Sequence, residues 1–265
     1  MADTSSPAVL VSVVLPVYNE ADNIRPVLEA LQTEVRSPHE TLVVYDSDED
    51  TTLPPARDIG AGYPQMRLVR NAYGKGVLNA LKTGIEAASG DVVVVTMADL
   101  SDDVTQIDEM AWLVRSGAGV AVASRYMPGG GQIGGPLVKS TLSRLAGLSL
   151  RWLARIDTHD PTNNFKAYSR RLVDAVDIES ESGFELGLEL TSKAHLMGLQ
   201  IVEIPTTWRG RNAGESNFKL MQWLPSYLRW YFQCLAGTWV GRRRSAGDSN
   251  YAGVDLVADP GHDLF

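Results

Sequence analysis

Acidic residues gather where a run of apolar residues ends, in the stretch VVVTMADLSDD at 93–103. It supplies the carboxylates of Asp99, Asp102 and Asp103, and a second acidic run, DSDED, occupies 46–50. Carboxylates at the end of a strand can hold a hard divalent cation, which takes oxygen ligands and usually bridges to substrate phosphates. Spacing alone favours solvated loop acids over a metal site, so the elements around these residues must decide.

The apolar runs that precede the acids recur along the first half of the chain. They are continuous and rich in β-branched residues, as expected of strands buried on both faces of a sheet, and lie at 9–15, 41–45, 66–69, 92–96 and 120–123. Between them, apolar residues keep helical spacing at 24–31, 78–85 and 104–114. This alternation predicts an α/β fold whose first half is built from right-handed βαβ units. For the whole chain we expect a Rossmann-like open mixed sheet flanked by helices.

Ligands of such sheets bind outside the carboxyl ends of the strands. Polar clusters fall at three of these ends, at 18–20, 46–50 and 99–103. We therefore expect them to meet in one crevice.

The second half of the chain has a different pattern. The stretch PGGGQIGGP at 128–136 would lose much conformational entropy in a regular helix or strand, because it is rich in glycine. It therefore predicts a mobile loop with glycine hinges, which could act as a lid. Helices are expected at 142–156 and 185–197, and a strand at 199–204. Since no clean linker divides the chain, we expect a single domain over 1–219.

Composition limits the function. With 265 residues and 44% apolar content, the chain can bury one large α/β core. A net charge of −8 argues against a nucleic-acid partner, so any basic site must be local. The single cysteine, Cys234, excludes an internal disulfide framework, and no signal-peptide pattern opens the sequence, which favours a cytoplasmic protein.

The segment 221–241 has the length of a membrane span but not its composition. It carries one charge, Arg229, is interrupted by Pro225, and is rich in tryptophan and tyrosine, which prefer membrane interfaces; the arginines of 242–244 follow it. This predicts an amphipathic helix over 220–244 lying on the cytoplasmic face of a membrane. Packing on the domain or at a homo-oligomer interface is the alternative. The polar, Gly-rich stretch 245–265 is expected to be a flexible tail.

Six motifs occur in an order that is specific when taken together. They are VVLPVYNEADNI at 13–24, the acidic turn at 45–52, GKG at 74–76, Ala98-Asp99 after a strand, SRY at 124–126 and DPTNNFKAY at 160–168. With this order the chain resembles family 2 glycosyltransferases of GT-A fold, and within them the polyprenyl (dolichyl) phosphate mannose or glucose synthases. The resemblance runs from about 9 to 220.

The resemblance implies that a hexose is transferred with inversion from a GDP- or UDP-sugar to a polyprenyl phosphate. On the donor side, Pro16, Tyr18 and Glu20 would line the nucleotide pocket, Asp46 would accept hydrogen bonds from the base, and Lys75 would lie near the donor. Asp99 would be the second aspartate of the Asp-x-Asp metal motif. The acceptor phosphate would be bound by Arg125, Lys139 and Ser143. The donor diphosphate would be bound by Arg209 or Arg211 together with Lys219.

This chemistry also follows from charge. Breaking a sugar–diphosphate bond leaves negative charge on the leaving group, which a metal ion or a basic clamp stabilises. A phosphate acceptor is already an anion and needs no general base, unlike a hydroxyl acceptor. The planar fork of Arg125 suits a phosphate, and Lys139 supplies a point charge where the family usually has a second arginine.

Two departures from the family pattern weaken the metal site. Met97 stands where the first aspartate of the metal motif is expected, and Tyr45 replaces the first acid of the Asp-Asp-Gly-Ser turn. A thioether is too soft for Mg²⁺ or Mn²⁺, which leaves Asp99, helped by Asp102 or Asp103 and by the donor's phosphates. Weak metal binding, or replacement of the ion by Arg and Lys, is the alternative.

Each candidate has a simpler structural explanation. Glu20 can cap the helix that begins near position 22, Lys75 and Asp46 can be solvated turn residues, Asp160 can cap a turn, and Glu185 and Glu189 can be exposed helix residues. Two other functions also stay open. One is a GT-A glycosyltransferase with a hydroxyl acceptor on a small molecule or glycan, and the other is a nucleotide-binding pseudoenzyme.

Overall fold

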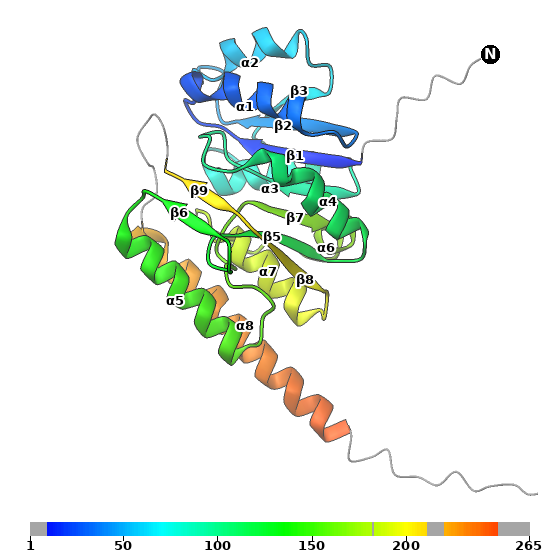
Figure 1. The fold of residues 1–265 in the computed structure, drawn as a ribbon, viewed down its shortest axis with the longest axis vertical. Helices are drawn as coiled ribbons and strands as arrows, with labels where there is room; N and C mark the ends of the chain where they lie inside the picture. Colours follow the sequence, from blue (N-terminus) through cyan, green and yellow to red (C-terminus); the bar gives the residue numbers. More distant parts are fainter. Residues whose placement is uncertain (1–9, 182, 211–219, 249–265) are drawn as a thin grey trace, which may run out of the picture.

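The computed structural model describes residues 10–181, 183–210 and 220–248. A seven-stranded sheet forms its centre, in the order β3-β2-β1-β4-β7-β5-β8 (Figure 1). The strands are β1 (Val11–Pro16), β2 (His39–Tyr45), β3 (Met66–Arg70), β4 (Val92–Val95), β5 (Val120–Ser124), β7 (Lys166–Ser169) and β8 (Ile201–Pro205). Residues of β1, β4 and β5 are buried throughout, which explains their unbroken apolar sequences.

Helices cover both faces of the sheet, each face with its own hydrophobic cluster. One cluster contains residues of α1 (Ala21–Glu34), α2 (Leu53–Gly60) and α4 (Ile107–Arg115), which follows the short 3₁₀ turn η1 (Val104–Gln106). The other contains residues of α3 (Val77–Ala87), α5 (Leu137–Leu153), α6 (Arg170–Ala175), α7 (Leu186–Leu196) and α8 (Leu220–Asp248). The expected open α/β sheet with flanking helices is confirmed.

One strand of the sheet runs against the others. Strand β7 pairs antiparallel with both β4 and β5, whereas the other pairs in the sheet are parallel. Its sequence, KAYS, is short and begins with a lysine, so it lacks the continuous apolar pattern that reveals the other strands. This strand was not predicted, but it confirms the expectation of a mixed sheet.

The glycine-rich stretch 128–136 is partly ordered by a distant segment. Strand β6 (Gly131–Ile133) pairs in parallel with β9 (Thr207–Arg209), and together they form a small second sheet. The expectation that this stretch holds no regular structure is therefore wrong, because a partner strand far along the chain supplies its backbone hydrogen bonds.

Helix α8 both packs on the domain and extends away from it. It lies beside α5 and α7 and continues past them (Figure 1), with Trp230 and Cys234 buried against the core. Its last residue is Asp248, four positions beyond the expected boundary at 244 between helix and tail, and 249–265 lie outside the described residues. In the part of the chain described, no helix combines the length and apolar character of a membrane span.

Candidate functional site

The carboxyl ends of the parallel strands bring the predicted residues to one edge of the sheet. Tyr18 and Glu20 follow β1, Asp46 follows β2, Asp99 follows β4 and Arg125 follows β5. Because β7 is antiparallel, its amino end lies at the same edge, and the segment 160–165 that leads into it does too. The predicted convergence of 18–20, 46–50 and 99–103 on one edge of the sheet is confirmed, and Arg125 and 160–165 lie at the same edge.

On the side predicted to bind the nucleotide, Asp46 shapes the turn before α3. Its carboxylate accepts hydrogen bonds from Asn71 Nδ2 at 2.8 Å and from the backbone N–H of Gly76 at 2.9 Å. Gly76 has φ 129°, a conformation that favours glycine. Lys75 lies next to this anchor and is exposed. Asp46 is thus a structured turn residue instead of a freely solvated acid.

The segment after β1 is fastened to the loop that follows Asp46. Asp50 is buried, and its Oδ1 accepts from the backbone N–H groups of Asn19, at 3.1 Å, and Thr52, at 2.8 Å. Glu20 is at the N-cap position of α1 but makes no side-chain cap of the helix, and its carboxylate accepts instead from the side-chain amide of Asn23, Nδ2, at 2.7 Å. Pro16 ends β1 in a buried position, while Tyr18 is 55% exposed and can receive a flat ring.

In the acidic turn after β4, the carboxylates of Asp102 and Asp99 accept different hydrogen bonds. Asp102 Oδ2 accepts from Thr96 Oγ1 and the backbone N–H of Met97, both at 3.1 Å, and so folds the turn back on the strand. Asp99 Oδ1 accepts from the backbone N–H of Ser101 at 3.1 Å. Burial and the negative charge of Asp99 raise the pKa of Asp102 to about 7.

The residues of this turn can hold a divalent cation only with help from a substrate. Met97 packs against the apolar core, so its thioether does not complete a hard-ion site. Among the described residues, no three His, Cys, Asp or Glu side chains form a group able to hold a metal ion. Mg²⁺ is commonly held by one or two carboxylates together with substrate phosphates, and Asp99 fits that role.

Arg125 and Asp160 form a buried ion pair on the opposite side of the site. Arg125 Nε lies 2.7 Å from Asp160 Oδ2 and Nη2 lies 2.9 Å from Oδ1, so the guanidinium fork meets both carboxylate oxygens. Their side chains are 10% and 0% exposed. Burial alone would raise the pKa of Asp160, but the charge and hydrogen bonds of Arg125 lower it. Asp160 also accepts from the backbone N–H of Asn163, so it caps a turn as expected and holds the arginine as well.

Helix α5 supplies the other two residues predicted to grip the acceptor. Ser143 Oγ lies 3.3 Å from Arg125 Nη2 and 2.5 Å from Thr162 Oγ1. Burial and the positive charge of Arg125 lower the pKa of Lys139 to about 8, against the opposing effect of Asp99. Lys139 lies in the first turn of α5, four residues before Ser143.

A cleft adjoins this cationic group. Its volume is about 420 Å³, and its lining includes Arg125, Tyr126, Ser140 and Arg144, with Leu137 among its apolar residues. Tyr126 presents its ring to the Arg125 guanidinium at 4.9 Å and donates its hydroxyl to Ser140 O at 3.3 Å. The cleft thus combines positive charge with apolar surface from the start of α5.

Of the basic residues predicted on the donor diphosphate, Arg209 is described. It is exposed in β9, and its backbone N–H donates to Ser101 O at 3.1 Å, which places this strand beside the acidic turn. Arg211 and Lys219 lie outside the described residues.

Several buried charges near the site were missed or misjudged from sequence. Lys166 is buried and donates to Pro161 O at 2.6 Å and Gly187 O at 2.9 Å, and burial lowers its pKa to about 7. Glu185 and Glu189 are also buried, so the expectation that they are exposed is wrong, although Glu189 does pair with Lys193 at 2.9 Å. No local pattern distinguishes these residues from surface charges.

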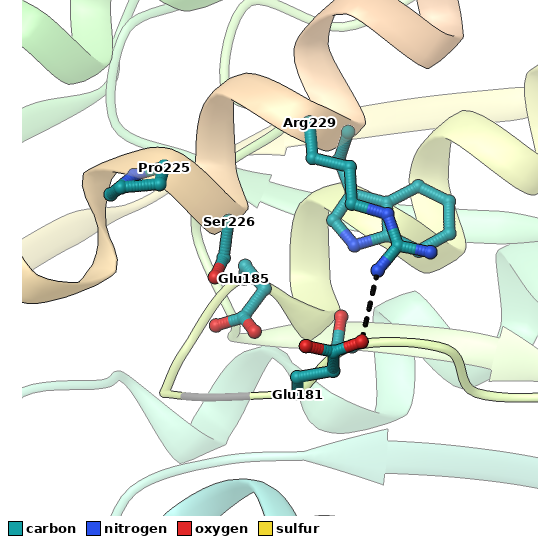
Figure 2. Close-up of a pocket in the computed structure, with 7 residues that line it drawn as sticks. Glu181, Glu185, Pro225, Ser226 and Arg229 are labelled. Atoms are coloured by element: carbon teal, nitrogen blue, oxygen red, sulfur yellow. Dashed lines mark hydrogen bonds and ion pairs between the residues drawn. The ribbon is translucent and has the colours of Figure 1, made fainter.

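Glu185 lines a second cavity, between the start of α7 and α8, with a volume of about 190 Å³ (Figure 2). Ser226 and Arg229 of α8 face it, and Arg229 pairs with Glu181 at 3.4 Å. The loop before α7 packs closely here, because a Cβ on Gly183 would lie 2.5 Å from the Trp223 ring. The cavity therefore belongs to the seam that joins α8 to the domain.

We predict that Asp160→Asn destabilises the protein by about 3–5 kcal/mol, because it leaves the Arg125 guanidinium buried without its counter-charge. Urea unfolding measures the effect. Asp174→Asn is the matched control, since its pair with Arg170 is an exposed i,i+4 contact whose loss should cost under about 1 kcal/mol. Equal losses for the two variants would contradict the importance of the buried pair.

Known proteins are similar in sequence to most of this chain. A relative from Pyrococcus furiosus, dolichol-phosphate mannosyltransferase, is 31% identical over 212 residues, covering 79% of this chain but only 59% of that protein's length. Polyprenol monophosphomannose synthase of Mycolicibacterium smegmatis is 28% identical, covering 80% of this chain and 85% of that protein. Undecaprenyl-phosphate mannosyltransferase of Micrococcus luteus is 27% identical, covering 88% of this chain and 98% of that protein.

The fold has solved counterparts. Glucosyl-3-phosphoglycerate synthase from Mycobacterium tuberculosis, in complex with Mn²⁺ and UDP-glucose, superposes with a TM-score of 0.61 at 20% identity, covering 86% of this chain and 79% of that one. This likeness confirms the expected GT-A fold. The model of the family described as "Glycosyl transferase family 2" matches residues 12–177. The chain therefore belongs to glycosyltransferase family 2.

Proposed function

We propose that this protein transfers a hexose, mannose or glucose, from a GDP- or UDP-sugar to the phosphate of a polyprenyl lipid, with inversion. The observation that supports the proposal is the 3.3 Å contact between Ser143 Oγ and the Arg125 guanidinium, with Lys139 one turn earlier on α5. The names of the relatives, which are polyprenyl- or dolichol-phosphate mannosyltransferases, support the same acceptor class.

In this proposal one side of the site binds the donor and the other binds the acceptor. Asp46, with Tyr18 and Glu20, would bind the nucleoside, and Lys75 would lie beside it. Asp99 would hold Mg²⁺ or Mn²⁺ through the donor's diphosphate, and the ion would neutralise charge on the leaving group. Arg209 in β9 is placed beside the acidic turn by its backbone bond to Ser101, and Arg211 and Lys219 are proposed partners of the same diphosphate.

On the acceptor side the phosphate oxygen is itself the nucleophile. Asp160 already holds the Arg125 side chain in one orientation, so binding of the acceptor phosphate by Arg125 would cost little further side-chain entropy. Ser143 and Lys139 would add a hydroxyl donor and a second charge. A phosphate anion carries no proton that must be removed, so the proposed reaction needs no general base.

The acceptor's lipid chain calls for a membrane surface, and α5 and α8 are the elements we propose to contact it. They lie side by side (Figure 1), joined by hydrogen bonds from Tyr231 to Ser149, at 2.9 Å, and from Trp239 Nε1 to Leu153 O, at 3.2 Å. Large exposed apolar residues on the two helices include Leu137, Val138, Leu142, Leu145, Trp152, Leu228, Phe232, Trp239 and Val240.

The basic residues of α5 also support a membrane contact by this helix. Helix α5 contains three basic residues, Lys139, Arg144 and Arg151, and no acidic one, in a protein whose net charge is −8. A basic, aromatic surface is suited to anionic lipid headgroups. We propose that the protein works at the cytoplasmic face of a membrane.

The direct test offers labelled GDP- and UDP-hexoses with a polyprenyl phosphate in detergent, with Mn²⁺ or with EDTA, and measures label in the organic phase. We expect a labelled lipid with at least one donor. Label transferred only to sugar or small-molecule hydroxyls would select the hydroxyl-acceptor alternative. Nucleotide binding without any turnover would select a pseudoenzyme.

We predict that kcat/KM for the acceptor falls as pH rises through about 8, because Lys139, whose pKa is lowered to about 8, must carry its charge to bind the phosphate. In Lys139→Arg the side chain stays charged at all accessible pH values, so kcat/KM for the acceptor should no longer fall above about pH 8. The kcat/KM for the donor serves as the internal control. A decline that persists unchanged in Lys139→Arg would assign it to another group.

We predict that Trp152→Ala weakens binding to anionic vesicles about tenfold, because this side chain is 83% exposed on α5 and would lose its burial at the interface. Trp112→Ala is the matched control, since Trp112 is 64% exposed on α4, against the opposite face of the sheet. Vesicle co-sedimentation measures both variants. Equal binding by the two would move the membrane contact away from α5.

A further inference from the structure

Helix α5 is seated on the domain at few points. Of its residues, all of which the structure describes, Gly147 and Leu150 are the buried ones, while residues such as Leu137 and Trp152 are strongly exposed. Gly147 and Leu150 are therefore where α5 is buried against the domain, in addition to the hydrogen bonds made by Ser143, Ser149 and Leu153.

Gly147 allows the helix to rest directly on the backbone of another segment. A Cβ built at this position would lie 2.1 Å from His159 O, 3.1 Å from His159 C and 3.1 Å from Pro161 Cδ. Carbonyl atoms cannot rotate out of the way as the end of a side chain can. Glycine is otherwise unfavourable inside a helix, so the close approach explains its presence here.

The segment beneath Gly147 is held firmly. Glu203 of β8 accepts from the backbone N–H of His159 at 2.8 Å and from Thr158 Oγ1 at 3.0 Å, and it also pairs with the His159 ring. Asp160, between His159 and Pro161, is bound to Arg125. If a side chain were added at Gly147, α5 would move, and the segment would stay.

The same helix presents the acceptor-binding residues to this segment. Ser143 lies one turn before Gly147 and contacts Thr162 Oγ1 at 2.5 Å and Arg125 Nη2 at 3.3 Å, and Lys139 lies one turn earlier still. A displacement of about 1 Å at Gly147 is enough to take the contact between Ser143 and Arg125 beyond hydrogen-bonding range.

We propose that Gly147 is a positioning residue for the acceptor phosphate. By seating α5 on the backbone of 159–161, it sets the distance between Ser143 and Lys139 on the helix and Arg125 on the sheet. This inference rests on the proposed function, since it assigns these three residues to one phosphate.

The test is Gly147→Ala, assayed with a polyprenyl phosphate in detergent so that membrane binding plays no part. We expect the acceptor KM to rise about tenfold or more, as loss of a hydrogen bond to a charged group would cause, with the donor KM changed less than about twofold. Gly62→Ala is the matched control, because its Cβ would meet only Ile59 O at an ordinary 3.7 Å.

A double-mutant cycle separates positioning from general damage. If Gly147 acts through Ser143, adding Ser143→Ala to Gly147→Ala should raise the acceptor KM little further, whereas independent effects would multiply. An unchanged acceptor KM in Gly147→Ala, or an equal rise in donor KM, would overturn the inference. Absence of turnover by the wild-type protein with polyprenyl phosphate would instead remove the proposed function, and this inference with it.

A second variant decides the matter if Gly147→Ala does not fold. Tyr231→Phe removes the hydrogen bond that ties α5 to α8 at Ser149 and leaves the seat at Gly147 intact. We expect its acceptor KM to stay within about twofold of wild type. A large rise would mean that α8, and not the seat at Gly147, sets the position of α5.

Discussion

The buried ion pair between Arg125 and Asp160 is the interaction on which the rest of the site depends. Removing two charges from water is costly, and the cost is recovered only when geometry is good and the remaining hydrogen-bonding groups are satisfied. Both conditions hold here, because the guanidinium fork meets both carboxylate oxygens and Asp160 also accepts backbone N–H groups. The pair joins the end of β5 to the segment before β7, and it presents a cation in a fixed orientation.

The antiparallel direction of β7 makes this pairing possible. A parallel strand at that place in the sheet would begin at the opposite edge, and the residues before it would lie far from the crevice. Because β7 is reversed, Asp160, Thr162 and Lys166 arrive at the carboxyl ends of β4 and β5. Helix α5 then rests on this segment through Gly147, which brings Ser143 to Arg125.

The opposite side of the crevice is organised by carboxylates that accept backbone hydrogen bonds. Asp46 shapes the turn before α3, Asp50 fastens the segment after β1, and Asp102 folds the turn that carries Asp99. Acids and cations thus face each other across one edge of the sheet. In the proposed reaction a phosphate would attack from the cationic side and the diphosphate would leave beside the acids, where a divalent cation held by Asp99 would offset their negative charges.

The sequence by itself determined strands β1 to β5, helices α1, α3 and α4, and the edge at which polar residues converge, because buried strands and amphipathic helices leave periodic patterns. The short helix α2 was not predicted. Motif order was enough to predict the family and to pick out Arg125, Lys139 and Ser143. Only the tertiary structure decided that Asp160 pairs with Arg125, that β7 is antiparallel and that the glycine-rich stretch pairs with β9. These features come from contacts between residues distant in sequence, such as the 35 positions between Arg125 and Asp160, which leave no local pattern.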